Sequence, residues 1–246
     1  MPGLELLVQA VPSSPDFFLI TKNATQKYIF KITEAHLDVA YAQLSNAVMK
    51  AHQTVLEQPN SQALYDYKYH SMLALTIAED LNTYTRLNVF QSKLPKKASI
   101  VLLPNADYFG KQTTDACYFK HYDISRMSMS FGNSIVPAVG EKMNFRHYQY
   151  GLFYQRMVDA YPLTVVDYKR FLNGNTVFCF DFSSSLSAHE EYLSPIVTEN
   201  VTLDIDFQNP TPHVVTCLIL MEFDDVIEIS QARVVTIASE NTANKI

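Results

Sequence analysis

Residues 177–182, 201–207 and 215–223 read VFCFDF, VTLDIDF and VTCLILMEF. Apolar side chains recur at every second position in these runs, which is the period of a β-strand with one set of side chains on each face of a sheet. In the middle run the alternate positions are Thr202, Asp204 and Asp206, so one face of that strand is expected to meet solvent. In the last run both faces are largely apolar, so that strand is expected to be covered on both sides. The pattern indicates a sandwich or barrel core rather than a catalytic cleft.

Composition limits the classes of function. Apolar residues make up 48% of the 246 positions and charged residues 18%, below the roughly 25% typical of soluble domains. Two interpretations stay open: a strand-rich fold that uses few charged residues, or a surface that is largely buried against neighbouring molecules. The 15 Tyr and 15 Phe favour strands and contact surfaces.

Charge and targeting signals argue against several roles. The net charge is −6 and the densest basic cluster is the pair Lys96 and Lys97, so no direct nucleic-acid binding is expected. The sequence contains neither a signal peptide nor an apolar run approaching the roughly 18 residues of a membrane span, so neither secretion nor membrane spanning is indicated. The glycosylation patterns at Asn23 and Asn200 are therefore interpreted as chance matches.

The first part of the chain predicts three strands and a helix. The strand candidates are Leu4–Ala10, Phe17–Thr21 and part of Tyr28–Ala42. Three strands alone cannot bury both faces of a sheet. We therefore expect them to pair with sequence upstream or to dock on the rest of the chain. Ser45 is the expected N-cap of a helix that runs to about Glu57, and residues 58–61 form a linker.

A second series of strands is expected after residue 62, with Gly132-Asn133 as a two-residue hairpin turn. The expected strands before the C-terminal runs are Tyr67–Ile77, Thr85–Gln91, Ser99–Leu103, Asp123–Phe131 and Ile135–Pro137. The period then changes to helical over Phe145–Tyr161, with Asn144 as the cap and Pro162 as the stop. Strands are expected to resume at Tyr168, with a turn at residues 172–175. About eight strands in two sheets make a jelly roll.

Candidate reactive groups are sparse. No two of the seven histidines lie within ten residues of each other, so the paired-histidine spacing of cupin metal sites is absent; they are His36, His52, His70, His121, His147, His189 and His213. A cation could be bound by four aspartates, Asp204, Asp206, Asp224 and Asp225, if they lie close together. Such residues more often lie on the solvent-exposed face or at the end of a strand. Ser183-Ser184-Ser185 lacks the glycines of a nucleophile elbow.

Three further features have two interpretations each. His189-Glu190-Glu191 is expected to be a solvated turn rather than a site. The helical face of Tyr150, Tyr154 and Tyr161 could be a ligand platform, but packing over a sheet is the commoner explanation. Cys179 and Cys217 lie in strand runs, where a thiol is usually a small buried hydrophobe.

Several strings carry a resemblance to one family. FLNGNTVFCFDF (171–182) is similar to the family's glycine-then-FxFDLTPDL segment, ENVTLDIDF (199–207) to GNLRLELRF, and PHVV (212–215) through MEFDDVIEI (221–229) to VNVIVYAEFDNIIEID. Upstream, FQSKLPKK (90–97) is similar to FLGQLPKR and NADYFG (105–110) to NDAFNG, while KITEA (31–35) and the helix after Ser45 resemble an inter-domain link. In this order the chain resembles the double jelly-roll, hexon-like major capsid protein of Maverick/Polinton elements and adintoviruses, within the adenovirus-like capsid lineage.

The resemblance implies an all-β fold with three parts. Residues 1–43 would be the last strands of an incomplete first jelly roll, 44–61 a linking helix and linker, and 62–246 the second jelly roll with a helical insertion near 145–161. It also implies a homotrimer that forms pseudo-hexagonal capsomers of an icosahedral virion, with neighbouring capsomers and a penton-like minor capsid protein as partners. No catalytic, cofactor-binding or metal-binding residue, no cofactor and no enzymatic activity are expected.

The chain departs from the family pattern at two strings. Ser183-Ser184-Ser185 stands where threonine and proline are usual, and Asp204 and Asp206 stand where basic residues are common. Two other functions remain as alternatives. One is a cellular, lectin-like jelly-roll module that binds a ligand without catalysis. The other is a cupin-type enzyme, which the histidine spacing disfavours.

Overall fold

The computed structural model describes residues 7–21, 28–59, 61–90, 93–137, 141–183, 185–190, 193, 197–232 and 234–237. The chain divides into two compact units. One unit comprises residues 13–26 and 68–224, and the other comprises 1–12, 27–67 and 225–246. Each unit is described by itself below.

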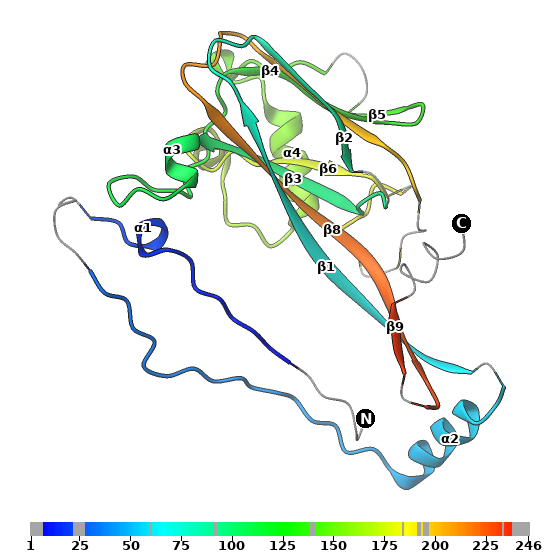
Figure 1. Ribbon diagram of the computed structural model, residues 1–246. Coiled ribbons are helices and arrows are strands. Elements are labelled where there is room, and N and C mark those ends of the chain that lie inside the picture. Colours follow the sequence, from blue (N-terminus) through cyan, green and yellow to red (C-terminus); the bar gives the residue numbers. More distant parts are fainter. Residues whose placement is uncertain are drawn as a thin grey trace. The chain divides into compact units, whose positions relative to one another are not determined.

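The described strands form two sheets (Figure 1). One sheet has the order β1-β8-β3-β6, with β9 also paired to β8, and the other has the order β2-β7-β4-β5. The bounds are β1 (Gln62–Ile77), β2 (Thr83–Phe90), β3 (Lys97–Pro104), β4 (Ile124–Phe131), β5 (Ser134–Val136), β6 (Phe178–Asp181), β7 (Val201–Phe207), β8 (Val215–Ser230) and β9 (Val235–Ile237).

The pairing is nested. The first strand pairs with the eighth, the second with the seventh, the third with the sixth and the fourth with the fifth. A chain that pairs in this way is a long hairpin rolled into two facing sheets, which is the jelly roll. The structure therefore confirms the expected fold class, an all-β jelly-roll sandwich with helical insertions.

The core of the larger unit lies between the two sheets. Ile100 and Ile219 of the first sheet and Met127 and Ile205 of the second are fully buried in one apolar cluster. Along β7 buried and partly exposed positions alternate without exception, as expected from its sequence. Burial of apolar area at roughly 25 cal/mol per Å² is the main term that holds such a sandwich together.

The described helices lie before β1 or in the connections between strands. They are α1 (Pro15–Phe18), α2 (Asn46–Leu56), α3 (Asn105–Tyr108), the 3₁₀ helix η1 (Phe145–His147), α4 (Gly151–Ala160) and α5 (Tyr168–Leu172). The inner face of α4 packs on β6, with the ring centroids of Phe153 and Phe178 5.9 Å apart. Within the described residues no helix is long and apolar enough to cross a membrane.

The single helix expected over Phe145–Tyr161 is interrupted. Asn144 caps η1 as expected, since its Oδ1 accepts a hydrogen bond from the His147 N–H at 3.1 Å. Tyr148 then adopts a left-handed backbone with φ of 58°, which ends the 3₁₀ turn, and α4 begins at Gly151. Reciprocal backbone bonds between Asn144 and Gln149 close the loop that separates the two helices.

A helix replaces the strand expected at Tyr168. The side chain of Asp167 accepts a hydrogen bond from the Arg170 N–H at 2.7 Å, so it caps α5 and the first residues after it become helical. The turn at residues 172–175 and the hairpin turn at Gly132-Asn133 are confirmed. Strands β1 and β8 are longer than expected, starting at Gln62 and ending at Ser230.

The strands expected in the first 42 residues are not formed in the described part of that segment. Pro15–Phe18 is a helical turn capped by Ser14, and residues 28–45 have no regular secondary structure. Residues 4–6 of the first candidate strand lie outside the described residues, and residues 7–10 form no strand. Single strands without a hydrogen-bonded neighbour are not stable in water, which accounts for the difference. The assignment of residues 1–43 to an incomplete first jelly roll stays a prediction.

The helix expected after Ser45 is confirmed as α2. The Ser45 Oγ accepts a hydrogen bond from the Val48 N–H at 3.4 Å, and the helix ends at Leu56, before Pro59. Its apolar residues Val48 and Val55 are exposed. The role of residues 44–61 as a link between domains stays a prediction.

Candidate functional site

The four aspartates considered as a cation site do not gather. Asp204 accepts a hydrogen bond from the Thr85 hydroxyl at 2.7 Å, and Asp206 pairs with Arg126 at 2.7 Å, both on the β2-β7-β4-β5 sheet. Asp224 lies on the other sheet beside Lys96, and the Asp225 carboxylate accepts a bond from the N–H of the next residue. Over the described ranges, no three His, Cys, Asp or Glu side chains lie close enough to hold a metal ion.

The tyrosine face of the helical insertion packs inside the protein. Tyr150 is 2% exposed and stacks on Tyr168 with ring centroids 4.3 Å apart. Tyr154 contacts the same Tyr168 edge-on and also meets Phe171. Tyr161 shares a 2.8 Å hydrogen bond with Ser99 on β3. The packing explanation is therefore confirmed over that of a ligand platform.

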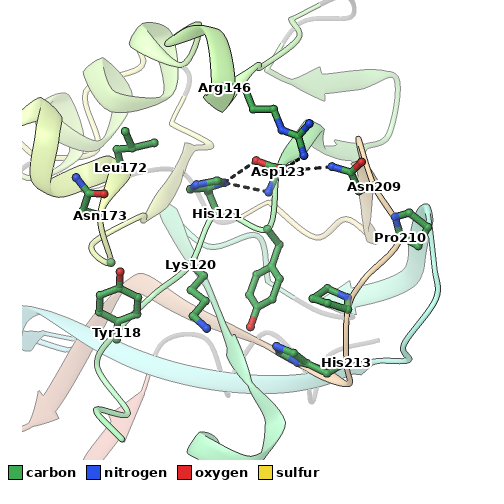
Figure 2. A pocket seen from close by; sticks show the side chains of 13 residues that line it. Tyr118, Lys120, His121, Asp123, Arg146, Leu172, Asn173, Asn209, Pro210 and His213 are labelled. Atoms are coloured by element: carbon green, nitrogen blue, oxygen red, sulfur yellow. Dashed lines mark hydrogen bonds and ion pairs between the residues drawn. The ribbon is translucent and has the colours of Figure 1, made fainter.

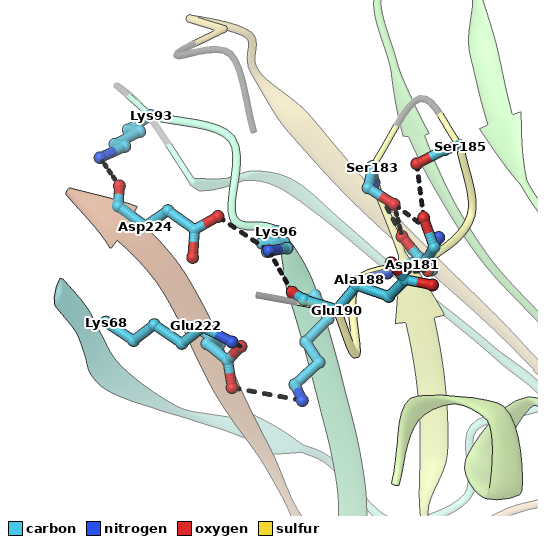
Figure 3. A network of polar contacts seen from close by, with 12 residues as sticks. Lys68, Lys93, Lys96, Asp181, Ser183, Ser185, Ala188, Glu190, Glu222 and Asp224 are labelled. Atoms are coloured by element: carbon cyan, nitrogen blue, oxygen red, sulfur yellow. Dashed lines mark hydrogen bonds and ion pairs between the residues drawn. The ribbon is translucent and has the colours of Figure 1, made fainter. Parts of the chain in front are cut away.

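The serine-rich loop after β6 is held by a carboxylate. Asp181 accepts hydrogen bonds from the N–H and hydroxyl groups of Ser183 and from the N–H of Ala188 (Figure 3). The carbonyl of Glu190 accepts a bond from Lys96 at 2.9 Å. These contacts close a loop rather than activate a nucleophile. Ser184 and Glu191 lie outside the described residues.

A buried ionic cluster links three strands of the first sheet. Glu222 on β8 is 8% exposed and lies directly opposite Lys97 on β3, with Nζ and Oε2 3.2 Å apart. Lys68 and His70, both on β1, approach the same carboxylate to 3.5 and 3.3 Å. Beside it, Lys96 pairs with Asp224 at 3.0 Å (Figure 3). Such a cluster fixes strand register more than it adds net stability.

Two of the three cysteines are inert core residues. Cys179 and Cys217 are buried, as expected, and Cys117 is exposed. Burial raises the pKa of the Cys179 thiol to about 11 and that of the Cys217 thiol to about 12, because a thiolate is disfavoured away from water. Both thiols are therefore neutral at physiological pH.

A pocket of about 530 Å³ lies among four segments of the chain that connect strands at one end of the sandwich. Figure 2 shows the side chains that line it. The β3–β4 connection, η1, the α5–β6 turn and the β7–β8 loop all contribute to it. Its lining residues are Tyr118, Lys120, His121, Tyr122, Asp123, Arg146, Leu172, Asn173, Gly174, Asn209, Pro210, Pro212 and His213. We call it the loop-end pocket.

Asp123 organises one wall of the loop-end pocket. Its Oδ2 receives hydrogen bonds from Arg146 and from the Asn209 amide, each at 3.3 Å. Its backbone N–H donates to Nδ1 of His121 at 2.9 Å, which places the ring proton of a neutral His121 on Nε2. Burial lowers the pKa of His121, against a smaller opposing effect of Asp123, so the neutral ring is favoured.

Two adjacent residues of this wall have strained backbones. Tyr122 and Asp123 both have a φ of 48°, a conformation that costs of order 1–3 kcal/mol for residues other than glycine. The Tyr122 hydroxyl is buried and has no hydrogen-bond partner among the described residues. Strain and unsatisfied groups are typical of functional sites rather than of plain surface loops.

Sequence reasoning did not find this pocket. It noted His121 and His213 only as members of a dispersed set of histidines, and the other lining residues carry no spacing signal. Four separate segments supply them, so only the jelly-roll topology brings them together.

Comparison with known proteins identifies no family. No protein-family model matches the chain, and no curated protein matches it in sequence. Solved structures with a similar backbone include that of the Sputnik virophage by cryo-EM (TM-score 0.46, 14% identity, 75% of this chain and 41% of that one). Two others are PBCV-1 VP54 fitted into a Sputnik reconstruction (0.43, 9%, 72% and 52%) and the mavirus major capsid protein (0.36, 7%, 78% and 45%). The chain thus spans about half of these structures, and TM-scores at this level do not identify a function.

Proposed function

We propose that this chain is a structural capsid protein: the C-terminal part of a double jelly-roll major capsid subunit that trimerises into the pseudo-hexagonal capsomers of an icosahedral virion. The observation that carries the proposal is the nested strand order β1-β8-β3-β6 and β2-β7-β4-β5 around a solid apolar core. A capsid subunit needs a rigid sandwich of this kind. The loops that connect its strands can then be long enough to contact neighbouring subunits.

The strings that resemble the hexon-like capsid family support the proposal by their location. They coincide with the α5–β6 turn and β6, with β7, with β8, and with the segment that enters β3. These strands come from both halves of the nested arrangement, so the resemblance covers the framework of the jelly roll rather than one local motif. The origin in Maverick/Polinton elements or adintoviruses is part of the proposal.

Exposed apolar side chains in the β5–β6 connection could be buried in contacts between subunits. Leu163 is 96% exposed, Val165 83% and Leu152 63%. Large apolar side chains left in water favour association, and permanent subunit interfaces bury roughly 2,000–5,000 Å². We propose that this insertion contacts neighbouring subunits, and that other capsomers and a penton-like minor capsid protein are further partners.

A structural role also accounts for the chemistry of the described side chains. The buried ionic cluster cross-links strands, the two buried thiols are neutral, and the tyrosine face is packed. We therefore propose a protein without enzymatic activity that functions in the virion.

Light scattering coupled to size exclusion tests this proposal. The protein expressed from the complete reading frame that encodes this chain should elute with the mass of three chains or of a larger assembly. Leu163→Glu should reduce the assembled fraction and leave the unfolding temperature unchanged, because Leu163 is almost fully exposed. A protein that stays monomeric at every concentration would contradict the proposal.

A further inference from the structure

The loop-end pocket carries an excess of positive charge. Lys120 and Arg146 are basic residues, whereas Asp123 is the one carboxylate among the described residues that line the pocket. Arg146 and Asn209 both donate to the same carboxylate oxygen of Asp123, Oδ2. Lys120 has no ion-pair partner within the described part of the chain. In a protein with a net charge of −6, a local cationic surface favours an anionic group on the ligand.

The remaining lining is suited to an amphipathic, hydroxylated molecule. Tyr118 is 45% exposed and offers a ring face, while Tyr122 is held edge-on against His213 with centroids 5.5 Å apart. The amide nitrogens of Asn173 and Asn209 donate to the Lys169 carbonyl and to Asp123. Their amide oxygens, on opposite sides of the pocket, can accept hydrogen bonds from a ligand (Figure 2). Aromatic faces pack on the C–H faces of a sugar ring, and amides hydrogen-bond to its hydroxyls.

The pocket is pre-formed by backbone hydrogen bonds. The Phe119 N–H donates to the Gly174 carbonyl at 2.8 Å, and the Gln208 N–H donates to the Asp123 carbonyl at 2.9 Å. Lys120 is held in place by its own N–H bond to the Leu102 carbonyl on β3 at 3.0 Å. Loops fixed in this way lose little conformational freedom on binding. The volume of about 530 Å³ falls in the roughly 300–1,000 Å³ range of small-molecule sites.

We propose that the loop-end pocket binds an acidic saccharide, with the sugar carboxylate at Lys120 and the ring against Tyr118. This is a recognition function in addition to the assembly role and does not depend on it. The mass measurement above tests assembly, and the following titration tests recognition.

Saturation-transfer NMR on the full chain, followed by titration, provides the test. The probe is 3′-sialyllactose, and lactose is its neutral counterpart. We expect transfer to the sialic acid ring and little to lactose. Lys120→Gln should weaken sialyllactose binding about tenfold, the effect of losing one charged hydrogen bond. Lys111→Gln, at an exposed lysine of the same β3–β4 connection outside the lining, should bind as the wild type does.

Several outcomes would overturn the proposal. They are equal transfer to the two sugars, no transfer to either, or equal affinity of the Lys120 and Lys111 variants. Displacement of sialyllactose by an equal concentration of inorganic phosphate would mean that the pocket recognises an anion and not a sugar. Lys120 is exposed, so its variant is expected to fold, and circular dichroism checks this.

Discussion

Glu222 illustrates how a single side chain can fix a sheet. It lies on the strand between β1 and β3, and basic groups from both neighbours approach its carboxylate. Lys97 is the most buried of these groups, at 10% side-chain exposure, and it also lies over the Tyr161 ring at 4.4 Å from its centroid. A slip of β3 by one residue would turn the Lys97 side chain to the other face of the sheet and separate its ammonium from the Glu222 carboxylate.

Glu222→Gln should therefore destabilise the protein. The amide keeps the shape of the side chain but leaves the Lys97 ammonium buried without a counter-charge. We expect the free energy of unfolding to fall by about 3 kcal/mol, measured by urea denaturation. Glu79→Gln, at an exposed glutamate in the β1–β2 turn, is the matched control and should change stability little. If both variants unfold at the same urea concentration, the ion pair makes no net contribution.

At the scale of elements, the α5–β6 turn determines the shape of the loop-end pocket. Gly174 has a φ of +93°, and a Cβ built on it would come within 2.2 Å of the Tyr118 ring. The close approach lets the Gly174 carbonyl accept the bond from Phe119, which joins this turn to the β3–β4 connection. The glycine thus couples two loops that are distant in sequence.

Gly174→Ala should strain the turn and displace Tyr118. Both the positive φ and the ring contact oppose the added methyl, so we expect a loss of about 1–3 kcal/mol in thermal or urea unfolding. Gly151→Ala is the comparison, because its nearest neighbour would be 3.9 Å away and its φ is not positive. That variant starts α4 and should be neutral or slightly stabilising. Equal destabilisation of the two variants would contradict this account of Gly174.

At the scale of the whole molecule, the two thiols buried in the sandwich stay uncharged over a wide pH range. The two buried thiols belong to different strands of the first sheet, Cys179 to β6 and Cys217 to β8. Their ordinary pKa is 9.0, and burial raises it to about 11 and about 12. Below pH 9 the thiols are neutral in the folded and unfolded states alike, so their stabilising contribution is complete.

Stability should decline as the pH rises from about 9 to about 12. In this window the unfolded chain releases thiol protons that the folded protein retains, which favours unfolding. Urea unfolding at a series of pH values measures the decline. At pH 8 a thiol reagent should modify Cys117 alone in the folded protein and all three cysteines in denaturant. Rapid reaction of Cys179 or Cys217 in the folded state would show that the sandwich opens.

The local sequence was sufficient to predict a strand where one face of the strand is exposed to solvent and the other is buried. The bounds and alternation of β7 follow directly from VTLDIDF, and Ser45 marks the start of α2. The local sequence was insufficient to predict secondary structure where a few residues decide between a helix and another conformation. The Asp167 cap that makes α5 a helix is visible in the sequence, but the left-handed Tyr148 that divides the insertion has no such signal.

Tertiary pairing accounts for the remaining differences. An apolar alternation such as that near residue 30 predicts a strand only if a partner lies beside it, and in the described chain none does. The loop-end pocket could not be predicted from local sequence patterns either. Asp123 and Asn209 are 86 residues apart, and only the position of β4 next to β7 brings their side chains together.

The nested pairing has a consequence for biogenesis. Within the nest of the eight strands β1 to β8, β4 and β5 are joined by a two-residue turn, whereas β3 pairs with β6, β2 with β7 and β1 with β8. A topology dominated by distant contacts folds slowly, on the order of milliseconds to seconds for small domains. During translation β1 and β2 therefore emerge from the ribosome with open edges and stay unpaired until β8 and β7, respectively, have been synthesised. Open strand edges and exposed apolar faces favour aggregation during that interval.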